Sequence, residues 1–111
     1  MTRLTILSVF FLFFSKLLTA QVLEGSISGT VVDGGDQKII DAATISLFKA
    51  KDSSLVKINL ADKSGNFLFE HIRFGKYYLL ATSTGRLQTY SPVLEINKNS
   101  TVNAGALQLT N

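Results

Sequence analysis

The sequence predicts an all-β fold, an antiparallel β-sandwich of about seven strands, preceded by an export segment. Three observations lead to this prediction. Apolar and polar residues alternate with a period of two over most of the chain from residue 26 onward, as in half-buried strands. Turn-forming residues, mainly Asp, Asn and Gly, interrupt the alternation about every 8 to 12 residues. No stretch after residue 20 has the apolar spacing of an amphipathic helix.

The first twenty residues have the pattern of a secretory signal peptide. Arg3 gives a basic start, residues 4–14 form an apolar run, and Ala20 supplies a small residue at the end. This run is too short to span a membrane, which takes about 20 apolar residues. An uncleaved amphipathic anchor fits less well, because the run is apolar all round. We therefore expect a signal peptide at residues 1–20 and one exported domain at residues 21–111.

Composition narrows the function classes. Removal of residues 1–20 takes away Arg3 and Lys16, so that 9 basic residues face 8 acidic ones and the domain is nearly neutral. No cluster of basic and aromatic residues remains, so no nucleic-acid partner is expected. The chain has no Cys, which excludes disulfides, thiolate metal sites and a lipid-bearing cysteine. The domain must rely on its apolar core for stability.

The first half of the domain is predicted to contain three strands. They cover residues 26–32, 43–48 and 55–60. The alternation places on one face Ile27, Gly29 and Val31 of the first, Ala43, Ile45 and Leu47 of the second, and Val56, Ile58 and Leu60 of the third. Residues 33–37, rich in Asp and Gly, form the first predicted turn.

The second half contains the most regular pattern. A turn at residues 62–66 leads to a strand carrying Phe67 and Phe69, and a second turn leads to a strand carrying Tyr77 and Leu79. Gly65 and Gly75 stand where these turns need positive φ. Short strands follow at residues 93–96, after Pro92, and around Leu107 and Leu109. Tyr77 is expected in the core and Tyr78 outside, beside Leu80.

Few residues have catalytic or metal-binding character. His71 is the single imidazole, it is expected in a turn, and no serine elbow or cysteine accompanies it. One histidine without cysteines cannot make a zinc site. Asp33 and Asp36, which flank two glycines, offer carboxylates to a calcium ion, but the further oxygen ligands are missing and Asp and Gly in such clusters are ordinary turn formers. We therefore expect no enzyme activity, no cofactor and no metal.

Exposed aromatic residues are the one candidate for ligand binding. Aromatic side chains on a sheet face can stack on sugars, and Tyr78, Tyr90 and Phe74 are the candidates for such stacking. The alternative is packing in the core or at an interface, which is the common role of aromatic residues in a small domain.

The chain also resembles a known family. The resemblance lies in residues 27–33 and 43–47 and in the spacing of Asp62, Gly65, Phe67, Phe69, Ile72, Gly75, Tyr77 and Leu79. These segments look like the carboxypeptidase regulatory-like domain, a transthyretin-like (prealbumin-like) Greek-key sandwich, over roughly residues 25–109. Residues 51–57 further resemble the version at the N-terminus of outer-membrane β-barrel proteins and TonB-dependent receptors. Residues 39–42 depart from the family, which commonly has Pro and Gly there.

The resemblance implies a role without catalysis. Transthyretin-like hydrolases of purine breakdown use several histidines and a C-terminal motif that residues 107–111 lack, and a peptidase's zinc ligands are missing. The expectation is a non-catalytic periplasmic accessory domain of an outer-membrane barrel protein or TonB-dependent receptor used in nutrient uptake, here an N-terminal portion standing alone. Its partners would be a barrel, a plug or other envelope proteins. The alternatives are a small secreted carbohydrate-binding module, with polysaccharide as ligand, and a truncated gene product.

Overall fold

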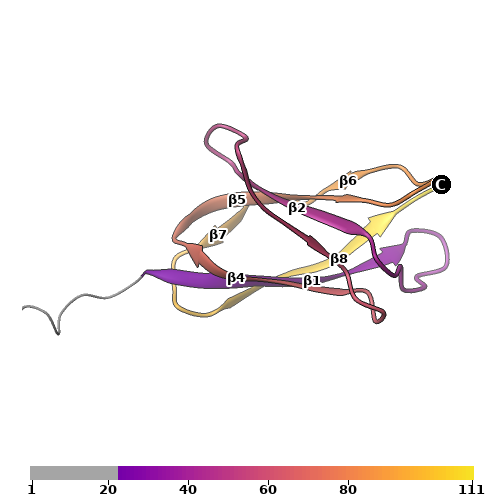
Figure 1. Ribbon diagram of the computed structural model, residues 1–111, viewed down its shortest axis with the longest axis horizontal. Helices are drawn as coiled ribbons and strands as arrows, with labels where there is room; N and C mark the ends of the chain where they lie inside the picture. Colours follow the sequence, from indigo (N-terminus) through magenta and orange to yellow (C-terminus); the bar gives the residue numbers. More distant parts are fainter. Residues whose placement is uncertain (1–22) are drawn as a thin grey trace, which may run out of the picture.

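The computed structural model describes residues 23–111, which form a two-layered arrangement of strands (Figure 1). The predicted signal peptide at residues 1–20 lies outside the described residues. The eight strands are β1 (Glu24–Asp33), β2 (Thr44–Lys49), β3 (Leu55–Leu60), β4 (Asn66–Arg73), β5 (Gly75–Thr82), β6 (Thr89–Tyr90), β7 (Leu94–Ile96) and β8 (Thr101–Leu109). Within this part of the chain, no helix has the length and apolar character needed to cross a membrane.

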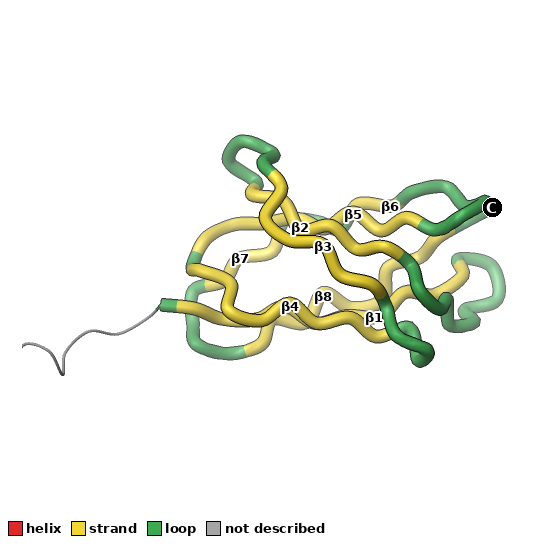
Figure 2. The backbone as a smooth tube through the Cα atoms, in the orientation of Figure 1, coloured by secondary structure: helices red, strands yellow, loops and turns green. Residues whose placement is uncertain are grey.

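Two sheets pack face to face (Figure 2). The first, sheet A, has the order β4-β1-β8, and the second, sheet B, has the order β3-β2-β5-β6 with β7 also paired to β5. Neighbouring strands are antiparallel except β1 and β8, which run parallel. The all-β sandwich predicted from the sequence is confirmed. The parallel pairing of β1 with β8 was not predicted, because the alternation along one strand carries no information about the direction of its neighbour.

The core lies between the sheets and is formed by alternate residues of the long strands. Ile27, Val31, Ile45, Leu47 and Leu79 are all fully buried, as the alternation predicts. The remaining buried apolar residues are Ile40, Ala43, Ala61, Phe67, Phe69, Ile72, Tyr77, Ala81, Ile96, Leu107 and Leu109. Burial of this apolar surface is the main source of stability in a chain without disulfides.

A bulge in β4 explains how three of its side chains reach this core. Phe69 pairs with Ile27 and Ile72 pairs with Gly25, so that two residues of β4 oppose one of β1. The extra residue is His71, whose φ of 58° is in the left-handed region. His71 therefore lies inside a strand and not in the predicted turn, since a single left-handed residue lets the strand change phase and continue.

Bulges in two other strands, β3 and β8, also change which side chains face the core. In β3 the register shifts between Leu47 and Phe48, so that Val56 packs against the core while Leu55 pairs with Phe48. The prediction that Val56 shares one face with Ile58 and Leu60 was therefore wrong. In β8, Gly105 has a φ of +76° at a similar register shift, and the strand begins at Thr101, earlier than the short strand expected around Leu107 and Leu109.

Side chains of β3 close one flank of the sandwich. Lys57 Nζ donates a hydrogen bond to the carbonyl of Glu70 at 2.9 Å, and Asn59 Nδ2 donates to the carbonyl of Leu68 at 2.7 Å. These bonds connect an edge strand of sheet B to an edge strand of sheet A. They also occupy two outward carbonyls of β4 that an incoming strand would need.

Candidate functional site

The outer surface of sheet B is the most conspicuous surface of the described residues. The side chains that share this side of the sheet include seven large apolar ones, here called the apolar face: Phe48, Leu55, Ile58, Leu60, Tyr78, Leu80 and Tyr90. Four of these remain largely exposed, with Leu60 reaching 64% and Tyr90 58%. Contiguous exposed apolar residues mark interaction sites more often than scattered ones do.

The strand register explains why these residues gather. Ser46 of β2 pairs with Ile58 on one side and with Leu80 on the other, and Leu80 pairs with Tyr90. Directly paired residues in antiparallel strands point to the same side of the sheet. One row of the apolar face therefore crosses four strands, interrupted only by a serine hydroxyl.

Aromatic rings form a second row on the same surface. The rings of Phe48 and Tyr78 stack with centroids 5.2 Å apart and an interplanar angle of 16°. The ring of Tyr90 lies 6.0 Å from that of Tyr78, tilted by 57°. One side of the Tyr78 ring is thus covered by Phe48, which leaves Tyr90 as the most accessible ring for a ligand.

The structure brings together two of the three predicted stacking residues. Tyr78 and Tyr90 are neighbours on the apolar face, while Phe74 is half-buried against the core in the turn between β4 and β5. Phe48 was missed by the sequence reasoning. Its place at the end of an alternating strand was visible, but its ring partner depends on the β2–β5 register, which the sequence does not specify.

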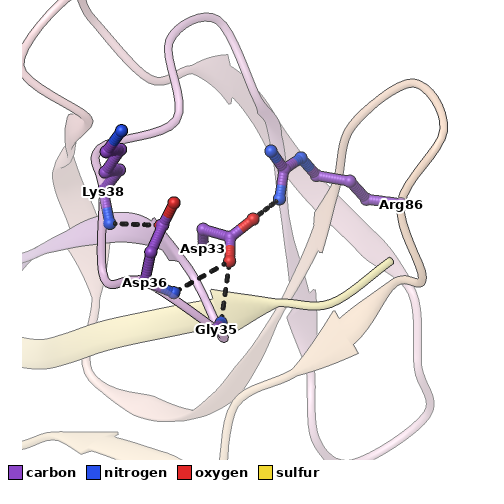
Figure 3. Close-up of polar contacts among 5 residues, drawn as sticks. All are labelled: Asp33, Gly35, Asp36, Lys38 and Arg86. Carbon is purple, nitrogen blue, oxygen red and sulfur yellow. Dashed lines mark hydrogen bonds and ion pairs between the residues drawn. The ribbon is translucent and has the colours of Figure 1, made fainter.

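The other predicted loop, which carries Asp33 and Asp36, is closed by its own hydrogen bonds (Figure 3). Asp33 Oδ1 accepts the N–H groups of Gly35 and Asp36, and Asp36 Oδ1 accepts that of Lys38. Asp33 Oδ2 forms an ion pair with Arg86, which comes from the loop between β5 and β6. These carboxylates cap a turn and tie together two loops at one end of the sandwich.

The same contacts set the protonation of Asp33. The hydrogen bond from Arg86 lowers the pKa of Asp33, and the backbone N–H groups of Gly35 and Asp36 add to the effect. Asp33 therefore keeps its charge well into the acid range. Among the described residues, no group of three or more His, Cys, Asp or Glu side chains is arranged to hold a metal ion.

His71 lies away from both regions. Its Nδ1 is 3.9 Å from Glu24 Oε1, and its imidazole is largely exposed. The two residues border a hollow of about 280 Å³ that is also lined by Glu70, by Gly25 and by small polar residues of β1 and of the segment before β8. The structure brings no serine or cysteine nucleophile into hydrogen-bond contact with the imidazole among the described residues.

Comparison with known proteins agrees with the fold. The family model described as carboxypeptidase regulatory-like domain matches residues 26–110. None of the curated proteins is similar enough in sequence to count as a match.

Solved structures share the architecture at low sequence identity. The Bacillus anthracis TIE protein has a TM-score of 0.69 and 20% identity over 80% of this chain, and 17% of its own length is covered. A major pilin subunit of Bacillus cereus has a TM-score of 0.59 and 16% identity over 80% of this chain and 30% of its own. The 5-hydroxyisourate hydrolase of Klebsiella pneumoniae has a TM-score of 0.52 and 12% identity, with 80% and 94% covered. At these identities the similarity establishes the fold alone, and the chain spans a minor part of the first two proteins.

Proposed function

Since the chain belongs to the carboxypeptidase regulatory-like domain family, we propose that it is an exported, non-catalytic accessory domain of the cell envelope. The finer proposal is a periplasmic domain associated with an outer-membrane barrel protein or TonB-dependent receptor in nutrient uptake. The pattern of a signal peptide at residues 1–20 supports export. The resemblance of residues 51–57 to the receptor-linked version of the domain supports the receptor context.

The observation that carries a binding role is the apolar face. Nearly all buried side chains of the described part are apolar, with Ser91 the one buried polar residue. The core is thus a scaffold, and four of the nine exposed large apolar side chains, Leu55, Ile58, Leu60 and Tyr90, lie together on the outer surface of sheet B. An accessory domain acts by binding other proteins. The exposed apolar row of Ile58, Leu80 and Tyr90 is more stable against the surface of a partner protein than in water.

Cell fractionation tests the proposed export to the cell envelope. The full chain with a C-terminal epitope, expressed in a Gram-negative host, should be recovered from the envelope fraction shortened by about twenty residues. A matched chain with Leu7→Arg and Leu12→Arg, which interrupt the apolar run, should stay in the cytoplasm at full length. Recovery of the unmutated chain from the cytoplasm with residues 1–20 intact would refute the proposal.

Crosslinking tests the contact surface. A photoreactive residue in place of Ile58 should crosslink to an envelope protein in cells of the source organism, whereas the same residue in place of Leu68 should not. Leu68 is the matched control, because it is 45% exposed on the outer side of sheet A. Equal crosslinking from both positions would remove the argument for the apolar face.

The exposed ring of Tyr90 supports a second candidate function, a carbohydrate-binding module. A sugar can stack on Tyr90, with Tyr78 beside it. Affinity gels containing polysaccharides test this, because retardation should be lost in Tyr90→Ala and kept in Leu68→Ala. Retardation that both substitutions leave unchanged would exclude the apolar face as the sugar site.

A further inference from the structure

A second surface, separate from the apolar face, concentrates positive charge. A hollow of about 310 Å³ lies where the β2–β3 hairpin meets the turn between β4 and β5. Four basic residues and two aromatic ones line it: Lys49, Lys51, Arg73, Lys76, Phe74 and Tyr77. We refer to this hollow as the cationic pocket.

Charge is unevenly distributed around this pocket. The described part has nine Lys and Arg residues, of which four line the pocket, and no carboxylate is among its lining residues. The Arg86–Asp33 ion pair and the contact of His71 with Glu24 both lie elsewhere in the described part. The four cations therefore have no anionic partner in contact within residues 23–111.

Two nearby acidic residues only partly offset this charge. Hydrogen bonds from Ser54 lower the pKa of Asp52, and the charges of Lys49 and Lys51 add to that effect. The Asp52 carboxylate is held by the N–H and hydroxyl of Ser54, in its own turn. Glu95 pairs with Lys76 along the β5–β7 ladder without forming an ion pair. The field in the pocket remains positive, with four cations against two flanking carboxylates.

Hydrogen bonds hold the two loops that form the pocket. The hydroxyl of Tyr77 donates to the carbonyl of Arg73 at 2.8 Å, and the N–H of Ala50 donates to the carbonyl of Lys76 at 3.0 Å. The backbone of the hairpin is thereby fixed to β5, and the turn that carries Phe74 is fixed to the strand that follows it. A ligand would meet backbone that is already positioned, so less ordering is needed on binding.

We propose that the cationic pocket binds a phosphoryl group carried by a small saccharide or by a lipid headgroup, with Phe74 packing against the remainder of the ligand. A phosphate monoester carries nearly two negative charges at neutral pH, against one on a carboxylate, so it gains more from several cations. Arg73 can bind two phosphoryl oxygens at once, and the lysines act as point charges.

Titration of residues 21–111 with inorganic phosphate tests whether the cationic pocket binds a phosphoryl group. This part of the chain contains both sheets and the entire described core, so it folds as one unit. Amide resonances of residues 73–77 should shift and saturate with phosphate, and chloride at equal ionic strength should leave them in place. Shifts spread evenly over all basic residues would refute the site.

Substitutions that remove one positive charge inside or outside the pocket distinguish a specific site from nonspecific electrostatic attraction. Lys51→Gln and Lys76→Gln should each weaken binding by roughly fivefold or more, since one charge about 4 Å away changes the binding of a singly charged group about fivefold in water and phosphate carries nearly two charges. Lys63→Gln and Lys98→Gln remove the same charge elsewhere and should leave the affinity within twofold. Equal weakening by all four substitutions, or tighter binding of acetate than of phosphate, would overturn the proposal.

Two further probes distinguish the source of the phosphoryl group. Glucose 6-phosphate binding more tightly than inorganic phosphate, with no binding of glucose, would assign the pocket to a phosphorylated saccharide. Binding to phosphatidic acid vesicles, which present a phosphate monoester, but not to phosphatidylcholine vesicles, weakened in Lys51→Gln and unchanged in Lys63→Gln, would assign it to a lipid headgroup. No response to inorganic phosphate, sugar phosphate or anionic vesicles would overturn the proposal.

Discussion

The hydroxyl oxygen of Ser91 accepts the backbone N–H of Leu79 at 2.8 Å, while the N–H of Ser91 donates to the carbonyl of Leu79 at 2.9 Å. Ser91 lies between β6 and β7, directly before Pro92, where the ladder on this edge of β5 is interrupted. A side chain thus takes the place of a backbone acceptor, and the buried N–H of Leu79 stays paired.

Ser91→Ala should therefore destabilise the domain by about 1 to 3 kcal/mol, because it leaves a buried N–H without a partner. Urea unfolding followed by circular dichroism measures the change in the free energy of unfolding. Ser64→Ala, in an exposed turn, is the control and should change it by less than about 0.5 kcal/mol. A loss no larger than that of the control would show that water replaces the hydroxyl.

The ion pair of Asp33 and Arg86 predicts a pH-dependent contribution to stability. The pKa of Asp33 is lowered in the folded state, so the stabilisation is complete above the pKa of the unfolded state and is lost as pH falls through the folded pKa. Arg86→Gln removes the largest cause of this shift. The difference in unfolding free energy between parent and Arg86→Gln should shrink below about pH 4, the unfolded value for Asp.

A double-mutant cycle with Asp33→Asn checks the assignment. If the pair acts as the structure indicates, the coupling between Asp33 and Arg86 should vanish in acid along with the effect of Arg86→Gln. A coupling that is unchanged from pH 7 to pH 3 would mean that the two loops are joined by something other than charge.

Gly65 and Gly85 have nearly the same φ but different surroundings. Substituting each by alanine therefore separates the cost of backbone strain from the cost of a steric clash. Gly65 has a φ of +75° and Gly85 one of +77°. A Cβ on Gly65 would meet the Ile39 side chain at 2.6 Å and the Val31 carbonyl at 2.9 Å, whereas one on Gly85 would meet nothing within 4 Å. Gly85→Ala should cost about 1 to 2 kcal/mol from left-handed strain alone.

Gly65→Ala should cost more than Gly85→Ala in the same thermal unfolding series, since the contacts with Ile39 and Val31 add to the strain. Equal melting temperatures for the two variants would indicate that the turn opens without cost. Such a result would contradict the close approach of residues 62–66 to β1.

Loss of the Asn59 hydrogen bond to β4 should affect both stability and aggregation. Asn59→Ala removes the donor to the Leu68 carbonyl and should lower the free energy of unfolding by about 0.5 to 1.5 kcal/mol. It should also speed strand-mediated aggregation, because part of the β4 edge becomes available. Light scattering during agitation measures this, with Asn99→Ala as control. No difference between the two variants would show that the edge is already protected.

Much of the core was predictable because burial alternates regularly along strands. Ile27, Val31, Ala43, Ile45 and Tyr77 were placed inside from their spacing alone, and all are buried. Gly65 and Gly75 were expected to have positive φ and do, at 75° and 156°. Predictions failed where a bulge changes the phase of a strand, as at Val56 in β3.

The candidate surfaces were less predictable than the core, because each is assembled from strands distant in the sequence. The spacing of Tyr78 and Leu80 indicated that they face outward, but the ring of Phe48 reaches Tyr78 only through the β2–β5 register. The cationic pocket likewise requires Lys51, from the β2–β3 hairpin, to lie beside Arg73, at the end of β4.

The amino-acid sequence by itself determined the strand period, most of the residues of the core and the scarcity of catalytic groups, because these depend on residue type and local spacing. The tertiary structure alone decided the parallel pairing of β1 with β8, the apolar face and the grouping of four cations around one pocket. The physical reason is that register and sheet order are set by packing between distant segments, which a local pattern does not encode.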